Sequence, residues 1–454
     1  MNGGISSASY LQRWRRLSRP AWLYLLHAAL LTSGLAVSSL FFNLAILALG
    51  YDRLFLGVLN TVSIAVAALL SLPLWWLAAR MGLRRALLTS AAFNAVSLLL
   101  FALWPAAVPL LLASALTGVA AVLFQVSSPP FMMRHSDPGE RDHLFSANAA
   151  INIGFAGMGS MVAGGLPVLL GRALGVGAES GLAYRATFAV AGIGLLLSLV
   201  PLLPIRERRA EVRAGKTGGQ SVVRSPQSAV RRVQLASRIT YHALLERIPE
   251  PWRGLLRRPG PVIRLLIPPF LISWGAALLI PYLNLFFKEQ FLVADTTLGR
   301  IFAALGVATG LAALAGPAIS ARIGKVRTVV VTQALSIPFL LALGFVPLLG
   351  VAVAAALARG ALFNMGTPLY DAFAMEQTDE PARPTVIGLI NGAYSAGYLV
   401  APLISTWVQA HYGFAPLFVA TAACYGLAVL ANYWFFVRGA IAGPGQEVLR
   451  EMVC

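Results

Sequence analysis

Twelve long apolar runs, separated by short polar connections, constrain this chain more than any other feature of its sequence. A helix needs roughly 20 residues to cross a bilayer core of about 30 Å, and lipid offers no partner to an unpaired backbone group. The composition agrees, because 11% of the 454 residues are charged, against about 25% in soluble domains. We therefore expect an all-α polytopic membrane protein with twelve transmembrane helices. The expected spans are 22–49, 54–77, 86–104, 106–133, 144–170, 186–204, 262–287, 298–320, 328–346, 348–374, 385–410 and 414–437.

The 35 Lys and Arg residues are divided unequally between the two alternating sets of connections. If the N-terminus and every even-numbered connection face the cytoplasm, 29 of them lie on that side, 5 lie on the other and Arg359 falls within a span. The positive-inside rule then predicts that both termini are cytoplasmic, in a bacterial-type inner (plasma) membrane. Because topology and the anionic lipid of the inner leaflet account for the net charge of +18, we expect no nucleic-acid partner.

The two halves of the chain resemble each other at a constant offset of 242 residues. The paired residues are Gly57 and Gly299, Gly82 and Gly324, and Pro105 and Pro347, with Asn43 and Asn284 paired at an offset of 241. Both copies place basic loops on the same side, which requires an even number of spans per copy. We therefore expect two parallel six-helix bundles, an arrangement that transporters use. The predicted segments are a cytoplasmic N-terminus (1–21), the first bundle (22–204), a basic cytoplasmic linker (205–260), the second bundle (261–438) and a cytoplasmic tail (439–454).

Two short loops carry a family resemblance. Residues Leu77–Arg85 resemble the G-x-L-A-D-R-x-G-R-K loop of the major facilitator superfamily, and Ser320–Arg327 repeats the pattern in the second half. Residues Arg359–Pro368 are similar to helix 10 of bacterial drug-efflux-like members. The resemblance covers nearly the whole chain and implies two bundles that rock about a central cavity. The loop aspartate of the family is replaced by Ala79 and Ala321.

Within those loops, two arginines and two glycines are the candidates for gating or coupling. The residues are Arg80, Gly82, Arg322 and Gly324. The loops require tight turns, so for the glycines a purely structural role is the stronger interpretation.

Arg359 is the sharpest candidate for a solute contact. A guanidinium stays charged and is costly inside a bilayer unless it faces a cavity or a partner. The alternative is an arginine that holds helix 10 to a neighbouring helix. Asp371 lies twelve residues further along the same predicted helix, or about 18 Å at 1.5 Å per residue. We therefore expect no direct pair and predict that Asp371 is a gate or interface residue on the cytoplasmic side.

Carboxamides on four predicted helices form the second set of cavity candidates, because an amide offers donors and acceptors without ionic cost. They are Asn43 on helix 1, Gln125 on helix 4, Asn284 on helix 7 and Asn364 on helix 10, the helices that the resemblance implies line the cavity. Hydrogen bonding between helices is the alternative for each. Asn391 and Tyr394 on helix 11 are assigned to packing.

The linker and the remaining inventory exclude several other functions. Apolar and basic residues within 205–260 predict either an amphipathic helix on the inner leaflet or a plain connection. Gly215–Thr217 resembles the end of a P-loop, but Ala210 stands where its first glycine is required, so we expect no nucleotide site. The five histidines and two cysteines show no metal-binding spacing. We expect no enzyme, no metal and no cofactor, with proton coupling left open.

The resemblance implies a secondary transporter that works by alternating access. Sparse acids and many apolar residues favour a small hydrophobic or amphipathic solute, anionic in part if Arg359 faces it. Export is the first expectation and uptake of a small organic solute the second. Ala79 and Ala321 keep open a non-transporting receptor or scaffold with the same fold. We expect a monomer whose partners are its small-molecule solute and membrane lipid.

Overall fold

The computed structural model describes residues 18–136, 141–205, 259–378 and 382–438. Within these ranges the chain is helical without strands, and it forms twelve helical segments long and apolar enough to cross a membrane. The expectation of an all-α fold with twelve spans is confirmed. The predicted linker helix lies outside the described residues, as do residues 1–17, the rest of 206–258 and the tail 439–454.

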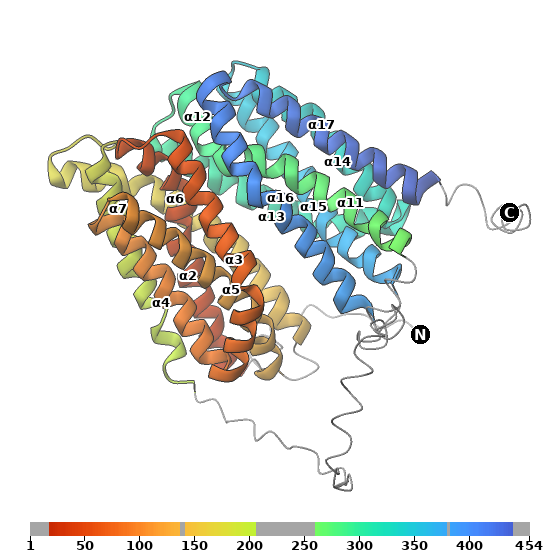
Figure 1. Cartoon of the computed structure of the whole chain (residues 1–454), viewed down its shortest axis with the longest axis horizontal. Helices are drawn as coiled ribbons and strands as arrows, with labels where there is room; N and C mark the ends of the chain where they lie inside the picture. Colours follow the sequence, from red (N-terminus) through yellow and green to blue (C-terminus); the bar gives the residue numbers. More distant parts are fainter. Residues whose placement is uncertain (1–17, 137–140, 206–258, 379–381, 439–454) are drawn as a thin grey trace, which may run out of the picture.

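Six spans make up each half, and the two bundles lie side by side (Figure 1). The amino-terminal half contains α2 (Arg19–Ala48), α3 (Arg53–Met81), α4 (Leu83–Leu103), α5 (Ala107–Arg134), α6 (Arg141–Leu174) and α7 (Gly181–Leu197) with the 3-10 turn η1 (Val200–Leu202). The carboxy-terminal half contains α11 (Pro259–Leu279), η4 (Ile280–Tyr282), α12 (Leu283–Phe291), α13 (Asp295–Ile323), α14 (Lys325–Phe345), α15 (Leu349–Glu376), α16 (Arg383–Tyr412) and α17 (Ala415–Asn432), which ends in the π-helical turn η6 (Tyr433–Val437).

The internal duplication is visible in the helices themselves. Helices α3 and α13 both have 29 residues, α4 and α14 both have 21, and α5 and α15 both have 28. Gly82 and Gly324 separate the first two helices of each trio with φ of 92° and 87°. Side chains with a Cβ avoid this conformation, so both tight turns depend on glycine.

The seventh span is broken, whereas the sequence pattern alone suggests one continuous run at 262–287. Helix α11 ends at Leu279, a 3-10 turn follows, and α12 continues the span to Phe291. Pro281 lies in that turn, and a proline has no N–H to donate to the preceding helical turn. The break places Asn284 at the start of a separate short helix.

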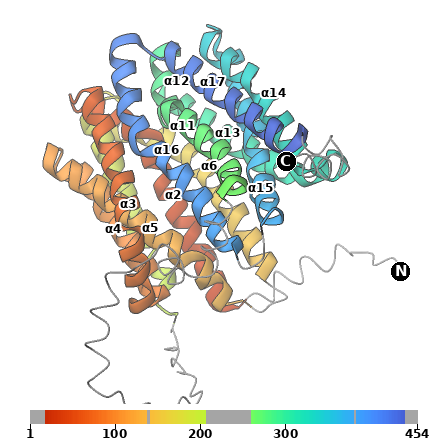
Figure 2. The same cartoon turned by 45° about the vertical axis from the view of Figure 1, so that its right-hand side comes forward.

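Two helix pairs hold the halves together. Helix α6 packs on α13 and α3 packs on α16, and Figure 2 shows the two bundles from the turned view. The main cluster of buried apolar side chains extends across this interface, with Phe41 and Tyr184 from one half and Phe286 and Phe418 from the other. Many apolar side chains outside it are exposed, such as Leu72 at 77% and Val108 at 76%, which suits a surface that faces lipid.

Candidate functional site

The two halves meet through polar contacts at one end of the molecule, which we call the closed end. It is formed by the connections 49–52, 175–180, 292–294 and 413–414 and the helix ends beside them. The hydrogen bonds that join described residues of the two halves all lie at or near this end. The opposite end, with the loops at Gly82 and Gly324, is called the open end.

Asn43 and Asn284 form a reciprocal joint between the halves. Asn43 Nδ2 donates to Asn284 Oδ1 at 2.9 Å and to the carbonyl of Pro281 at 2.6 Å. Asn284 Nδ2 donates back to the carbonyl of Leu40 at 2.8 Å. The two asparagines are 4% and 1% exposed. Their hydrogen bonds are therefore satisfied by each other and by backbone, which favours the interhelical interpretation for Asn284.

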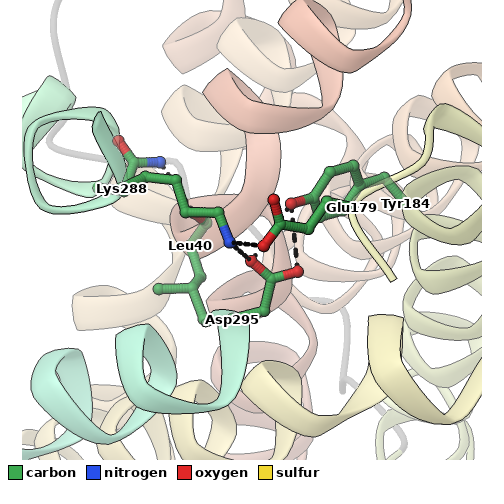
Figure 3. A network of polar contacts seen from close by, with 6 residues as sticks. Leu40, Glu179, Tyr184, Lys288 and Asp295 are labelled. Atoms are coloured by element: carbon green, nitrogen blue, oxygen red, sulfur yellow. Dashed lines mark hydrogen bonds and ion pairs between the residues drawn. The ribbon is translucent and has the colours of Figure 1, made fainter. Parts of the chain in front are cut away.

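An ion-pair network around the buried Asp295 lies beside this joint (Figure 3). Lys288 Nζ is 2.6 Å from Asp295 Oδ1 in its own half and 2.5 Å from Glu179 Oε1 in the other half. Tyr184, also in the other half, donates to Asp295 Oδ2 at 3.1 Å. Asp295 is 2% exposed, so its carboxylate depends on these partners. No motif in the sequence marks these residues as a group, although each lies at the end of an apolar run.

A second ion pair ties the other helix pair together. Arg53 at the start of α3 lies 2.7 Å from Glu289 Oε1 on α12, and its guanidinium donates to Gln409 Oε1 on α16 at 3.2 Å. Asp52 caps α3 by accepting from the backbone N–H of Phe55. The chain therefore places this cation at the interface and fixes the helix that carries it.

Gly57 and Gly299, which occupy the same position in the two repeats, let the halves approach closely. A Cβ on Gly299 would lie 2.6 Å from the carbonyl oxygen of Ser160 and 2.8 Å from Gly164 Cα, both on α6. A Cβ on Gly57 would collide with Thr406 Oγ1 on α16. The same position in both repeats thus serves the same purpose, which is close packing of α3 and α13 against the opposite half.

Towards the open end the interface separates. The close contact between α6 and α13 reaches Ile153 and Gly310, and beyond it no hydrogen bond or ion pair joins described residues of the two halves. Lys325 pairs with Glu376 at this end, but both residues belong to the carboxy-terminal half. The described structure is therefore closed at one end and parted at the other.

The amino-terminal half holds a cavity of about 270 Å³ with an uncharged polar wall. Its polar lining residues are Ser38, Ser39, Asn43, Asn60, Ser63, Ser114 and Thr117. Ser114 Oγ is buried without a hydrogen-bond partner. The wall offers hydroxyl and amide groups, which suit a neutral polar group of a solute.

The carboxy-terminal half holds a cavity of about 260 Å³ with a different chemistry. Aromatic and amide side chains line it together with one carboxylate, that of Asp371. The lining residues are Pro269, Ile272, Gln333, Phe363, Asn364, Thr367, Tyr370, Asp371, Ile390, Asn391 and Tyr394. Asn364, a cavity candidate from the sequence, is one of these lining residues. Asp371, expected at a gate or interface, and Asn391 and Tyr394, assigned to packing, line the same cavity.

Arg359 lies beside this cavity and is not among its lining residues. Its Nη2 donates to the hydroxyl of Tyr425 on α17 at 3.1 Å, and the guanidinium lies 5.5 Å from the centre of the Phe363 ring. Phe363 in turn stacks on Tyr425 at 4.6 Å. The arginine is 7% exposed and has no ion pair among the described residues. These contacts favour the alternative in which Arg359 holds helices together.

The other candidates are spread along the structure. Gln125 is an exposed residue of α5 and lines none of the cavities described above. Arg80 and Arg322 are exposed at the open end, where the Arg80 guanidinium stacks 3.7 Å from the centre of the Trp76 ring. Gly82 and Gly324 form the tight turns described above. The structure therefore brings Asn43 to Asn284 and Asn364 to Asp371, and leaves Gln125 apart from both pairs.

A family model matches almost the full length of the chain, over residues 26–268 and 265–451, and its description is Major Facilitator Superfamily. The chain belongs to the Major Facilitator Superfamily. As a member of the superfamily it is a membrane transporter and not an enzyme. No curated protein matches the chain by sequence.

Solved structures of superfamily members share the fold at low sequence identity. A D-xylose–proton symporter aligns with a TM-score of 0.66 at 16% identity, covering 91% of this chain and 97% of that one. A point mutant of the nucleoside transporter NupG aligns at 0.65 and 14% identity, covering 92% and 99%. A bacterial homologue of the human lysosomal transporter Spinster, inward-facing and unoccupied, aligns at 0.66 and 15% identity, covering 96% of each chain.

Proposed function

We propose that this superfamily member exports a small hydrophobic or amphipathic organic solute by alternating access. The observation that carries the proposal is the asymmetry of the interface. Polar contacts join the halves at the closed end, while the halves part at the open end, and each half contains a cavity. A rocking of the two bundles about a central pathway would exchange these two ends.

The direction of the open end follows from charge. Arg80, Arg84, Arg85 and Arg322 lie at the open end, with Lys325 beside them, whereas the connections at the closed end are nearly free of basic residues. By the positive-inside rule we assign the open end and both termini to the cytoplasm of a bacterial-type inner membrane. The described state would then be open to the cytoplasm, where an exporter takes up its solute and an importer releases it. The resemblance of helix 10 to drug-efflux-like members supports export.

Uptake is the second candidate, because one of the similar structures is named a proton symporter. Proton coupling therefore stays part of the proposal for either direction. The lining residues Asn43 and Asn364 are the proposed solute contacts, one in each half. No cofactor is required for either direction.

The test is solute flux in liposomes that contain the purified protein, with a panel of small organic compounds and with or without an imposed pH gradient. We expect saturable flux of at least one apolar or amphipathic compound. A flux that is the same with and without the pH gradient would contradict proton coupling. Absence of flux for the whole panel would contradict transport and favour a receptor or scaffold.

A reversible cross-link across the closed end is a second test of alternating access. Cysteines replace Arg53 and Glu289, which pair across the two halves at 2.7 Å, in a background with C424S and C454S, and a short methanethiosulfonate cross-linker joins them. The cross-link should stop flux, and its reduction should restore it, because the closed end must open once per cycle. Flux that continues in the cross-linked protein would contradict the proposal.

A further inference from the structure

Asp371 stands apart from the other acidic side chains that the structure describes. Glu179 and Asp295 share Lys288, Glu289 pairs with Arg53, and Glu376 pairs with Lys325, while Asp52 caps α3. Asp371 has no ion pair and no hydrogen bond with a described residue. A half-buried carboxylate without a partner is costly in a membrane protein, so the position suits a cation other than those of the described residues.

The cavity around Asp371 supplies hydrogen-bond acceptors and leaves them unused. Gln333 is 4% exposed, and its Oε1 is buried without a partner. Asn364 Nδ2 donates to the carbonyl of Gly360 at 2.8 Å, and Asn364 Oδ1 is available as an acceptor. Together with the carboxylate of Asp371, the wall presents three acceptor groups on α14 and α15. Such a set is complementary to a group that donates several N–H bonds.

The rest of the wall suits an organic body. Phe363, Tyr370 and Tyr394 contribute aromatic rings, with Ile272 and Ile390 beside them. Aromatic faces attract cations as well as apolar groups. The volume of about 260 Å³ is slightly below the roughly 300–1,000 Å³ of pockets for drug-sized ligands. The cavity therefore fits a small aromatic amine, or the amine-bearing end of a larger solute.

We propose that this cavity is a recognition site for a protonated primary or secondary amine, with Asp371 as its counter-ion and with Gln333 and Asn364 as its N–H acceptors. The proposal rests on the proposed function only in that the cavity belongs to the solute pathway. It reverses the charge expected from Arg359, whose guanidinium is turned to Tyr425 on α17. The solute is thus cationic where the sequence analysis allowed a partly anionic one.

The test is equilibrium binding of 2-phenylethylamine to the purified full-length protein. The competitors are 2-phenylethanol, 3-phenylpropionate and the N,N,N-trimethyl derivative of the amine. We expect the amine to bind at least tenfold more tightly than the alcohol and the carboxylate. The trimethyl derivative should bind more weakly than the amine, because it keeps the charge but donates no N–H. Equal binding of the amine and the alcohol would overturn the proposal.

Three variants locate the effect. Asp371→Asn should weaken amine binding by about 10- to 100-fold, the range for a hydrogen bond to a charged group. Asp371→Glu should retain most of the binding, which separates charge from folding. Glu376→Gln is the matched control on the same helix, because its carboxylate pairs with Lys325 at the open end. Unchanged binding in a folded Asp371→Asn protein would overturn the proposal.

The amine-site proposal and the transport proposal can be contradicted separately, the first by binding measurements and the second by flux measurements. Saturable flux of neutral compounds without amine binding would overturn this inference and leave the proposed transport intact. Amine binding without flux of any compound would support the amine site and contradict the proposed transport function. If Asp371→Asn abolishes only the effect of a pH gradient and keeps the preference for the amine, the cation held by Asp371 is a proton and the inference fails.

Discussion

Replacement of Lys288 by Met should open the closed end. Lys288 compensates Asp295, whose side chain is 1% exposed, and also reaches Glu179 in the opposite half. Without the lysine, the closed state buries a carboxylate that keeps only the hydrogen bond from Tyr184. Opening allows water to reach that carboxylate, so the substitution favours the state that is open at this end.

The magnitude follows from the burial of the two pairs. Breaking a buried ion pair costs about 3–5 kcal/mol, whereas an exposed pair contributes about 0–1 kcal/mol. Glu179 is 60% exposed and Lys288 12%, so the lower part of the buried range applies, and tyrosine's hydrogen bond reduces it further. We expect a shift of about 2–3 kcal/mol, or roughly 30- to 150-fold in the ratio of the two states.

The assay is the labelling rate of a cysteine placed at Leu40 in the C424S, C454S background. Leu40 is 0% exposed and lies beside this network, so a membrane-impermeant maleimide should reach it only when the closed end opens. Lys288→Met should raise the rate at least tenfold. Lys325→Met is the control, because that lysine pairs with Glu376 within one half. Equal rates in the two variants would refute the reasoning.

Three further substitutions test the packing. Gly299→Val should increase the same labelling rate, because a Cβ added there would lie 2.8 Å from Gly164 Cα. The control is Gly350→Ala, where no atom lies within 4 Å of an added Cβ. Equal labelling rates in the two variants would contradict the prediction. Gly324→Ala should lower the free energy of unfolding by about 1–3 kcal/mol because φ is 87°, measured by thermal unfolding against Gly350→Ala. Arg359→Gln should lower the unfolding temperature and leave the amine affinity unchanged, because the guanidinium donates to a tyrosine on α17. Weaker amine binding in this variant would show that Arg359 contributes to the solute site.

Much of the fold could be predicted because its signals are local. The length of each apolar run reports a span, and the observed helices agree with the expected runs except at two spans. The sixth ends in a 3-10 turn at Val200–Leu202, and the seventh is interrupted at Pro281. The repeat of 242 residues predicted tight turns at both Gly82 and Gly324, and the equal lengths of the matching helices agree with the duplication. Of the candidate site, the cavity lining of Asn43 and its hydrogen bond to Asn284 across the halves both depend on the packing of helices that are far apart in the sequence.

The sequence by itself determined the number of spans, the duplication and the segregation of basic loops, because hydropathy, spacing and charge are properties of consecutive residues. Only the tertiary structure decided which ionisable groups share a surface. Lys288 and Glu179 come from different halves and meet at 2.5 Å. Arg359 and Asp371 share one helix, yet the first is turned to α17 and the second to a cavity. The direction of a side chain depends on the helices packed against it, so the charge that the solute meets could be read only from the assembled bundle.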